Sequence, residues 1–150
     1  MQPRDFLKNE DFIQIIQQSL IQTLSLLFKN NIPFKVVTDI SRVDFNPKLP
    51  SSFMQNLQSL TVFVLENYTF TSAKIVDNCL TFEAGFGSEN YASLVSVPIG
   101  AILQISIEDT PIFLNLSIDT AKPKQTKEDK SKESLEALLS NPENQKLIKK

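Results

Sequence analysis

The clearest pattern of apolar and polar positions lies in residues 12–28 and predicts an amphipathic helix. Asn9, Glu10 and Asp11 come directly before it, and a capping asparagine followed by acids suits the positive end of a helix dipole. The polar stripe contains Gln14, Gln18, Gln22, Ser25 and Lys29, and the apolar stripe contains Ile13, Ile16, Leu20, Leu24 and Leu27. Their spacing of three and four residues matches the helical period.

Further apolar residues widen the apolar stripe beyond what one contact with a sheet needs: Phe12, Ile15, Ile21, Leu26 and Phe28. A helix that is apolar over most of its circumference must be covered on more than one side. Loops of the same chain would satisfy this requirement, and so would the same helix of a second copy. The pattern favours neither.

Short strands are predicted after the helix. Residues 34–38 begin the β region, and residues 61–66 (TVFVLE) are apolar on both faces, which is typical of a central strand. Residues 74–76 and 79–86 predict a hairpin, because Asp77-Asn78 tolerates the left-handed backbone of a tight turn. Residues 103–107 and 112–118 alternate around Asp109-Thr110-Pro111 and predict a second hairpin. One helix before six or seven strands predicts an α+β, mainly β fold, a small barrel or sandwich.

All three glycines of the chain, Gly85, Gly87 and Gly100, fall between residues 82 and 105. Glycine marks backbone that bends, takes a positive φ or lets another chain come close. Alternation places Leu80, Phe82, Ala84 and Phe86 on one face of a strand. This stretch is either the floor of a groove for an extended peptide or an ordinary bulged hairpin of the β core.

The composition changes at Asp119. Residues 119–150 hold eight lysines and six acids, a net charge of +2, which leaves seven basic and eleven acidic residues in 1–118, a net charge of −4. Residues 120–134 lack apolar periodicity and are predicted to be disordered. The last five residues place Leu147 and Ile148 between lysines, which predicts a short docking motif. We therefore expect a domain at 1–118 and a tail at 119–150.

The residue inventory argues against catalysis. The chain has no histidine and one cysteine, Cys79, so the commonest general base, zinc sites of the usual kinds and internal disulfides are excluded. No phosphate-binding glycine loop or nucleophile elbow is present. We predict no catalytic residues, no metal and no cofactor. No run reaches the length of a membrane span and no signal peptide opens the chain, so we expect a cytoplasmic protein that does not bind membranes.

Four motifs stand in a recognisable order: PFKVVTD at residues 33–39, FEAGFG at 82–87, VSVPIGAILQI at 95–105, and Ile112-Phe113. Together they resemble the SspB family, the stringent starvation protein B adaptors of the ClpXP protease, over residues 11–113. Departures occur where the family has an arginine (Gly85) and a second turn glycine (Ser88), and where Asp109-Thr110-Pro111 replaces a glycine-rich turn. The family tail is acidic and ends in one lysine, whereas this one is basic and ends in two.

The resemblance implies an Sm-like β fold, a homodimer through helix 12–28, and capture of ssrA-tagged proteins for the ClpX unfoldase. By resemblance, the peptide-binding residues are Val36, Val37, Ala84, Gly85, Phe86, Gly87, Ile112 and Phe113. The ClpX-docking residues would be Leu147, Ile148, Lys149 and Lys150.

Two other functions stay open. A dimeric chaperone for one dedicated client would also combine a helix, a sheet and an acidic body, but it would not need the aliphatic pair in the tail. An Sm-like RNA-binding module would need a basic patch with stacking aromatic residues. The net charge of residues 1–118 argues against the second, and no nucleic-acid partner is expected.

Overall fold

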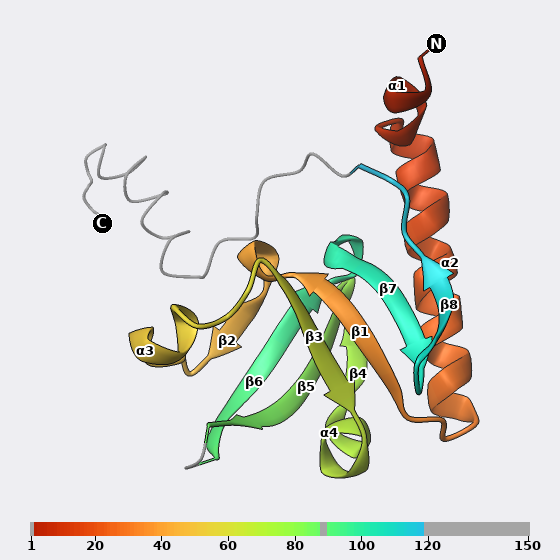
Figure 1. Cartoon of the computed structure of the whole chain (residues 1–150). Coiled ribbons are helices and arrows are strands. Elements are labelled where there is room, and N and C mark those ends of the chain that lie inside the picture. Colours follow the sequence, from red (N-terminus) through yellow and green to blue (C-terminus); the bar gives the residue numbers. More distant parts are fainter. Residues whose placement is uncertain (1, 88–89, 119–150) are drawn as a thin grey trace.

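The computed structural model describes residues 2–87 and 90–118 (Figure 1). A short helix, α1 (Pro3–Leu7), and a long helix, α2 (Glu10–Lys29), precede the strands. Within the described residues the strands form two four-stranded antiparallel sheets. Sheet A has the order β3-β1-β7-β8 and sheet B the order β2-β6-β5-β4. The predicted α+β class, with a helix before antiparallel β-structure, is confirmed, and the two sheets do not close into a barrel.

The strands of sheet A are β1 (Phe34–Asp39), β3 (Leu60–Leu65), β7 (Ile102–Ile107) and β8 (Thr110–Leu114). Those of sheet B are β2 (Asp44–Asn46), β4 (Lys74–Val76), β5 (Cys79–Phe86) and β6 (Tyr91–Pro98). The connections include 3-10 turns η1 (Ile40–Arg42) and η2 (Ile99–Ala101) and short helices α3 (Ser51–Met54) and α4 (Asn67–Ser72). Residues 67–72, which connect β3 to β4, are therefore helical.

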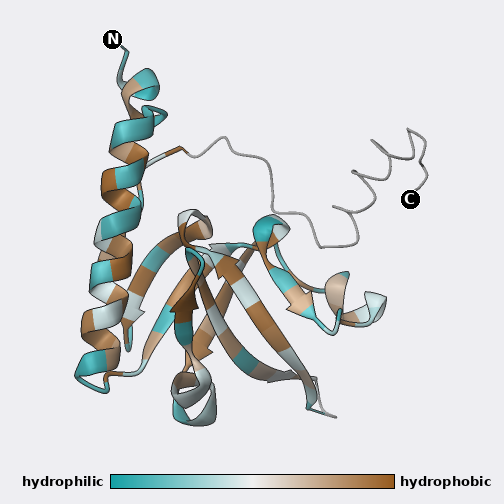
Figure 2. Ribbon diagram, turned by 180° about the vertical axis from the view of Figure 1, so that it is seen from behind, coloured by the Kyte–Doolittle hydropathy of each residue, from teal (hydrophilic) through white to brown (hydrophobic). Residues whose placement is uncertain are grey.

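Helix α2 begins where the sequence predicts. The Asn9 side chain accepts hydrogen bonds from the backbone N–H groups of Asp11 (2.9 Å) and Phe12 (3.1 Å) and so satisfies two of the free donors at the helix start. Three leucines of the apolar stripe, Leu20, Leu24 and Leu27, are buried, while its five polar positions are exposed. The hydropathy colours alternate along the helix accordingly (Figure 2).

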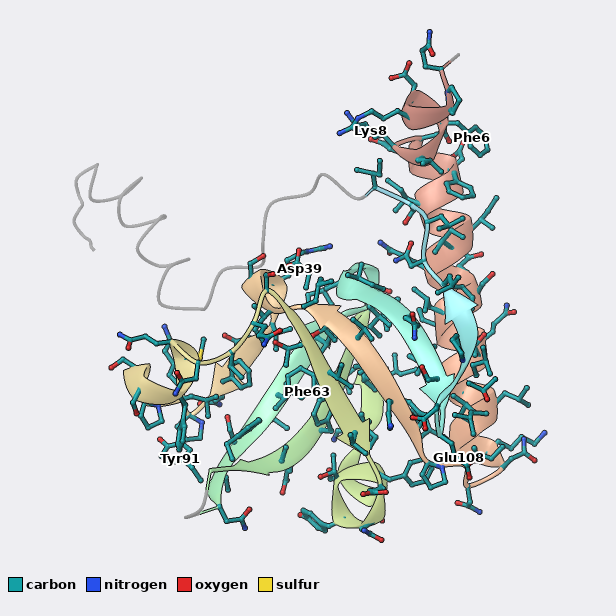
Figure 3. The ribbon with its side chains drawn as sticks, in the orientation of Figure 1. Phe6, Lys8, Asp39, Phe63, Tyr91 and Glu108 are labelled. Atoms are coloured by element: carbon teal, nitrogen blue, oxygen red, sulfur yellow. The ribbon has the colours of Figure 1, made fainter. Side chains whose placement is uncertain are left out.

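The core lies between the inner faces of the two sheets and α2. Phe63 of β3 is central to it: its ring centroid lies 5.4 Å from that of Phe82 and 6.3 Å from that of Phe45, both in sheet B. Figure 3 shows Phe63 under β3, in the middle of the molecule. Phe28 of α2 contacts Phe34 of β1 at 5.6 Å between centroids. Aromatic contacts of this kind join all three layers.

Strand β3 was expected to be central, and that prediction is wrong. Among the described strands it pairs only with β1, and it lies at one edge of sheet A. Its inward residues Phe63 and Leu65 are buried, but Leu60, Val62 and Val64 are exposed, Val62 by 51%. The strand is apolar on both faces because one face packs into the core, while the other is apolar but exposed to solvent.

The two predicted hairpins differ in outcome. Asp77 (φ 50°) and Asn78 (φ 62°) form the left-handed turn between β4 and β5, as expected. The last hairpin turns at Glu108 and Asp109, one position earlier than predicted, because Pro111 already pairs with Ser106 in β8. Strand β8 also ends at Leu114, short of the expected residue 118.

Candidate functional site

Two of the four site residues predicted in β1 and β8, Val36 and Phe113, lie in one row across sheet A. The register places Phe63 opposite Val36, Val36 opposite Ile105, and Ile105 opposite Phe113. This row faces the core: Val36 is 0% exposed and Phe113 is half-buried. The side chain of Val36 is therefore part of the core beneath the proposed site and is not accessible to a ligand. Side chains alternate along a strand, so Val37 is on the opposite face of β1 and does not share one groove wall with Val36. Ile112 is exposed.

The predicted site residues 84–87, at the end of β5 and directly after it, alternate between half-buried and exposed positions. Ala84 and Phe86 continue the inner face of Leu80 and Phe82 and are half-buried, whereas Gly85 and Gly87 are exposed. Phe86 reaches both sheets: its ring centroid is 5.7 Å from that of Phe45 and 6.5 Å from that of Phe63. Phe63 thus connects the β5 residues to the row that contains Val36.

Gly85 at the end of β5 and Gly87 directly after it are explained by the chain's own side chains. A Cβ at Gly85 would collide with the side chain of Asn90, and a Cβ at Gly87 would collide with the ring of Phe53. Gly87 also has a φ of +74°, which favours glycine. Phe53 comes from α3 and stacks edge-on against Tyr91 with a centroid distance of 6.4 Å. The glycines therefore make room for residues 53 and 90.

Phe53 and Asn90 were missed as part of the site. The sequence offers one weak signal, since Phe53, Met54 and Leu57 are apolar residues at helical spacing in a polar segment. Two hydrogen bonds hold the residues before α3 against the β5–β6 hairpin. The hydroxyl of Tyr91 donates to the carbonyl of Lys48 (3.2 Å), and that of Ser93 donates to the carbonyl of Pro47 (2.9 Å). These long-range contacts leave no local pattern.

Two strand edges face the same aromatic cluster. β4 pairs with β5 only as far as Thr81, and the hydroxyl oxygen of Ser72 accepts the next hydrogen bond, from the N–H of Glu83 (2.9 Å). Beyond that point no strand among the described residues pairs with this side of β5. The outer side of β3 is likewise without a partner strand there. Phe63 of β3 contacts Phe82 and Phe86 of β5, so these rings join the two strands that carry the edges.

The surface hollows lie elsewhere. One, of about 320 Å³, is lined by Lys35, Val64, Glu66 and Glu108 among others. Two more, of about 540 Å³ and 240 Å³, lie on the outer face of sheet B, the face that carries Lys74, Glu83 and Leu94. None of these three hollows is lined by residues 84–87.

One strong polar contact marks the outer face of sheet B. The hydroxyl of Tyr68 in α4 donates to Oε1 of Glu83 at 2.7 Å. This hydrogen bond, together with the negative charge of Glu83, raises the pKa of Tyr68 above its usual value of 10.0, because losing the phenolic proton would place two negative charges together.

The described residues contain no group of three or more His, Cys, Asp or Glu side chains that would hold a metal ion. Cys79, the single cysteine, is buried. None of the helices in residues 2–87 and 90–118 is long and apolar enough to cross a membrane. The predicted docking residues Leu147, Ile148, Lys149 and Lys150 lie outside the described residues.

No protein-family model and no curated protein matches the chain. The assignment of a function therefore depends on the order of motifs in the sequence and on the geometry given above.

Proposed function

We propose that the protein is a proteolysis adaptor with an Sm-like body, which binds ssrA-type degradation tags and delivers tagged proteins to ClpXP through residues 147–150. The observation that carries this proposal is a pair of strand edges, on β3 and on the distal part of β5, that no described strand pairs with and whose strands are joined by the contact of Phe63 with Phe86. The order of the four sequence motifs supports it.

An edge strand offers a row of backbone donors and acceptors to an added strand. An extended tag gains affinity from these backbone hydrogen bonds and selectivity from pockets that accept alternate side chains. Half-buried Ala84 and Phe86 supply an apolar surface next to the edge of β5. An apolar surface beside unpaired backbone groups suits a peptide with small and aliphatic side chains.

Delivery depends on tethering. A tail of about 30 residues makes the second contact, with the unfoldase, intramolecular and gives it an effective concentration in the millimolar range. A weak motif such as Leu147-Ile148 between lysines is then sufficient for transfer.

The proposal includes a homodimer through α2. Ile15 and Leu26 are exposed, and eleven positions correspond to about three helical turns, so the two side chains share one face of the helix. Pairing this face with a second copy would cover both and place two tag sites and two tails in one assembly. Ile15→Glu combined with Leu26→Glu should then shift the mass in sedimentation from dimer to monomer.

The test measures tag binding and delivery separately. In Ala84→Asp, a charge on the apolar side of β5 should lower the affinity for a labelled ssrA peptide more than tenfold. Ala92→Asp is the matched control, because Ala92 lies on the opposite, exposed face of the same hairpin. Ala84→Ser repeats the test with a milder change, and thermal melts check folding. Removing residues 147–150 should keep peptide affinity and abolish degradation by ClpXP. Unchanged peptide affinity in both Ala84 variants would overturn the proposed site.

A further inference from the structure

The two hollows on the outer face of sheet B share two of their lining residues. Glu83 and Leu94 line both of them. We call the combined surface the outer trough and define it by Tyr68, Lys74, Val76, Glu83 and Leu94. It lies on the face of β5 opposite to Ala84 and Phe86, so it is separate from the strand edges proposed to bind the tag.

The strand register fixes the positions of two opposite charges in the outer trough. Lys74 is opposite Thr81, and Glu83 is opposite Leu94, two residues further along β5. Two residues of a strand span about 7 Å. Lys35 forms an ion pair with Asp109, whereas Lys74 and Glu83 are not paired with each other. Glu83 accepts from Tyr68 through Oε1, which leaves Oε2 for another donor.

Between these charges the surface is apolar. Val76 and Leu94 are exposed, although sheet positions that face water are ordinarily polar, and Tyr68 exposes its ring beside them. The outer trough therefore fits a peptide segment that carries one acidic and one basic side chain together with aliphatic ones. Such a segment covers the exposed apolar atoms and pairs both charges.

We propose that the segment bound in the outer trough is residues 143–149 of the same chain. Its sequence, ENQKLIK, supplies Glu143 for Lys74, Lys146 or Lys149 for Glu83, and Leu147 and Ile148 for the surface of Val76 and Leu94. The net charges are opposite in sign, −4 in residues 1–118 and +2 in residues 119–150, and therefore attract each other. This pairing of charges and aliphatic side chains identifies the occupant.

The connection is long enough. The last described residue is Ile118, and about 25 residues lead from it to Glu143, a length that spans up to roughly 80 Å when extended. That exceeds the diameter of a domain of this size. Because the connection is covalent, the effective concentration of the segment is in the millimolar range, and a contact with a dissociation constant of that order is populated. Leu147 and Ile148 are then held on the body until a competitor displaces them.

The test uses the full chain. Methyl signals of Val76 and Leu94 are followed by NMR in the unaltered chain and in a chain with Leu147→Ser and Ile148→Ser. These signals should shift between the two proteins. Adding a synthetic peptide of residues 143–149 to the altered chain should restore the original positions, whereas a peptide of scrambled order should not.

The charge contact is tested in the same assay. Glu83→Lys should weaken binding of the synthetic peptide about tenfold, since it replaces an attraction to lysine by a repulsion, and raised salt should weaken binding to the unaltered protein. Glu108→Lys is the matched control, because it changes the net charge equally at an exposed position outside the outer trough. Glu83→Gln serves if the lysine variant does not fold.

Methyl signals that do not differ between the unaltered chain and the chain with Leu147→Ser and Ile148→Ser would overturn the proposal. So would equal peptide affinity of the Glu83 and Glu108 variants. Displacement of the methyl signals by an ssrA peptide, with no effect of the 143–149 peptide, would assign the outer trough to the tag instead. Loss of tag binding in Ala84→Asp does not bear on this site, so failure of the adaptor function and failure of the tail contact are distinguishable.

Discussion

The ring of Phe53 covers the Cα of Gly87, although the two residues come from α3 and from the end of the β5–β6 hairpin. The contact fills the space that a side chain at position 87 would occupy. It also ties the segment between β2 and β3 to the hairpin that carries Ala84 and Phe86. The shape of the β5 edge at this end thus depends on a residue that is distant in the sequence.

Gly87→Ala should destabilise the fold. The left-handed backbone alone costs about 1–2 kcal/mol for an alanine, and the collision with Phe53 adds to this. The measurement is the free energy of unfolding in urea. In a Phe53→Ala background the same substitution should cost only the backbone part. An equal cost in both backgrounds would show that the ring does not restrict position 87.

Val62→Lys should reduce self-association of the protein at high concentration. Val62 is exposed on edge strand β3, and a lysine on an edge is a common way in which proteins prevent strand pairing between molecules. Light scattering against concentration measures the effect. Leu116→Lys is the control, because Leu116 is exposed but lies outside the strands. Equal scattering by the two variants would mean that the edge of β3 does not mediate association.

Glu83→Gln should lower the pKa of Tyr68. The carboxylate of Glu83 favours the protonated phenol through a hydrogen bond and through its charge, and a neutral amide removes the charge. A raised pKa in the folded state stabilises the fold at pH values below the ordinary tyrosine pKa, and this contribution is lost as the pH rises through the folded pKa.

Ultraviolet absorbance of the phenolate measures this change directly, because the chain has no tryptophan and two tyrosines. The same titration of Tyr68→Phe identifies which of the two transitions belongs to Tyr68. An identical alkaline transition in the unaltered protein and in Glu83→Gln would contradict the prediction.

The features that the sequence predicts correctly are local ones. Asn9 caps α2 through bonds to residues two and three positions away, and Asp77-Asn78 turns the chain within four residues. Alternation also placed Ala84 and Phe86 on the face of Phe82. In each of these cases the residues that determine the structure are neighbours in the chain.

The features that the sequence does not predict depend on which strands pair with each other and which faces they bury. β3 has the apolar composition of a central strand, yet β1 is its one partner among the described strands and three aliphatic side chains on its outer face are exposed. Val36 is buried because its face of β1 packs into the core, and the motif that contains Val36 does not reveal which face that is. The cover that Phe53 and Asn90 form over the glycines likewise requires contacts between distant segments.

The position of β1 has a consequence for the order of assembly. One neighbour, β3, follows it closely, but the other, β7, is made only after every strand of sheet B. During synthesis β1 and β3 can pair early, while the second side of β1 waits for residues 102–107 to leave the ribosome. Pairings of such high sequence separation slow folding and leave strand edges exposed to other chains in the meantime. The nascent chain is therefore most vulnerable to misassembly just before its last hairpin emerges.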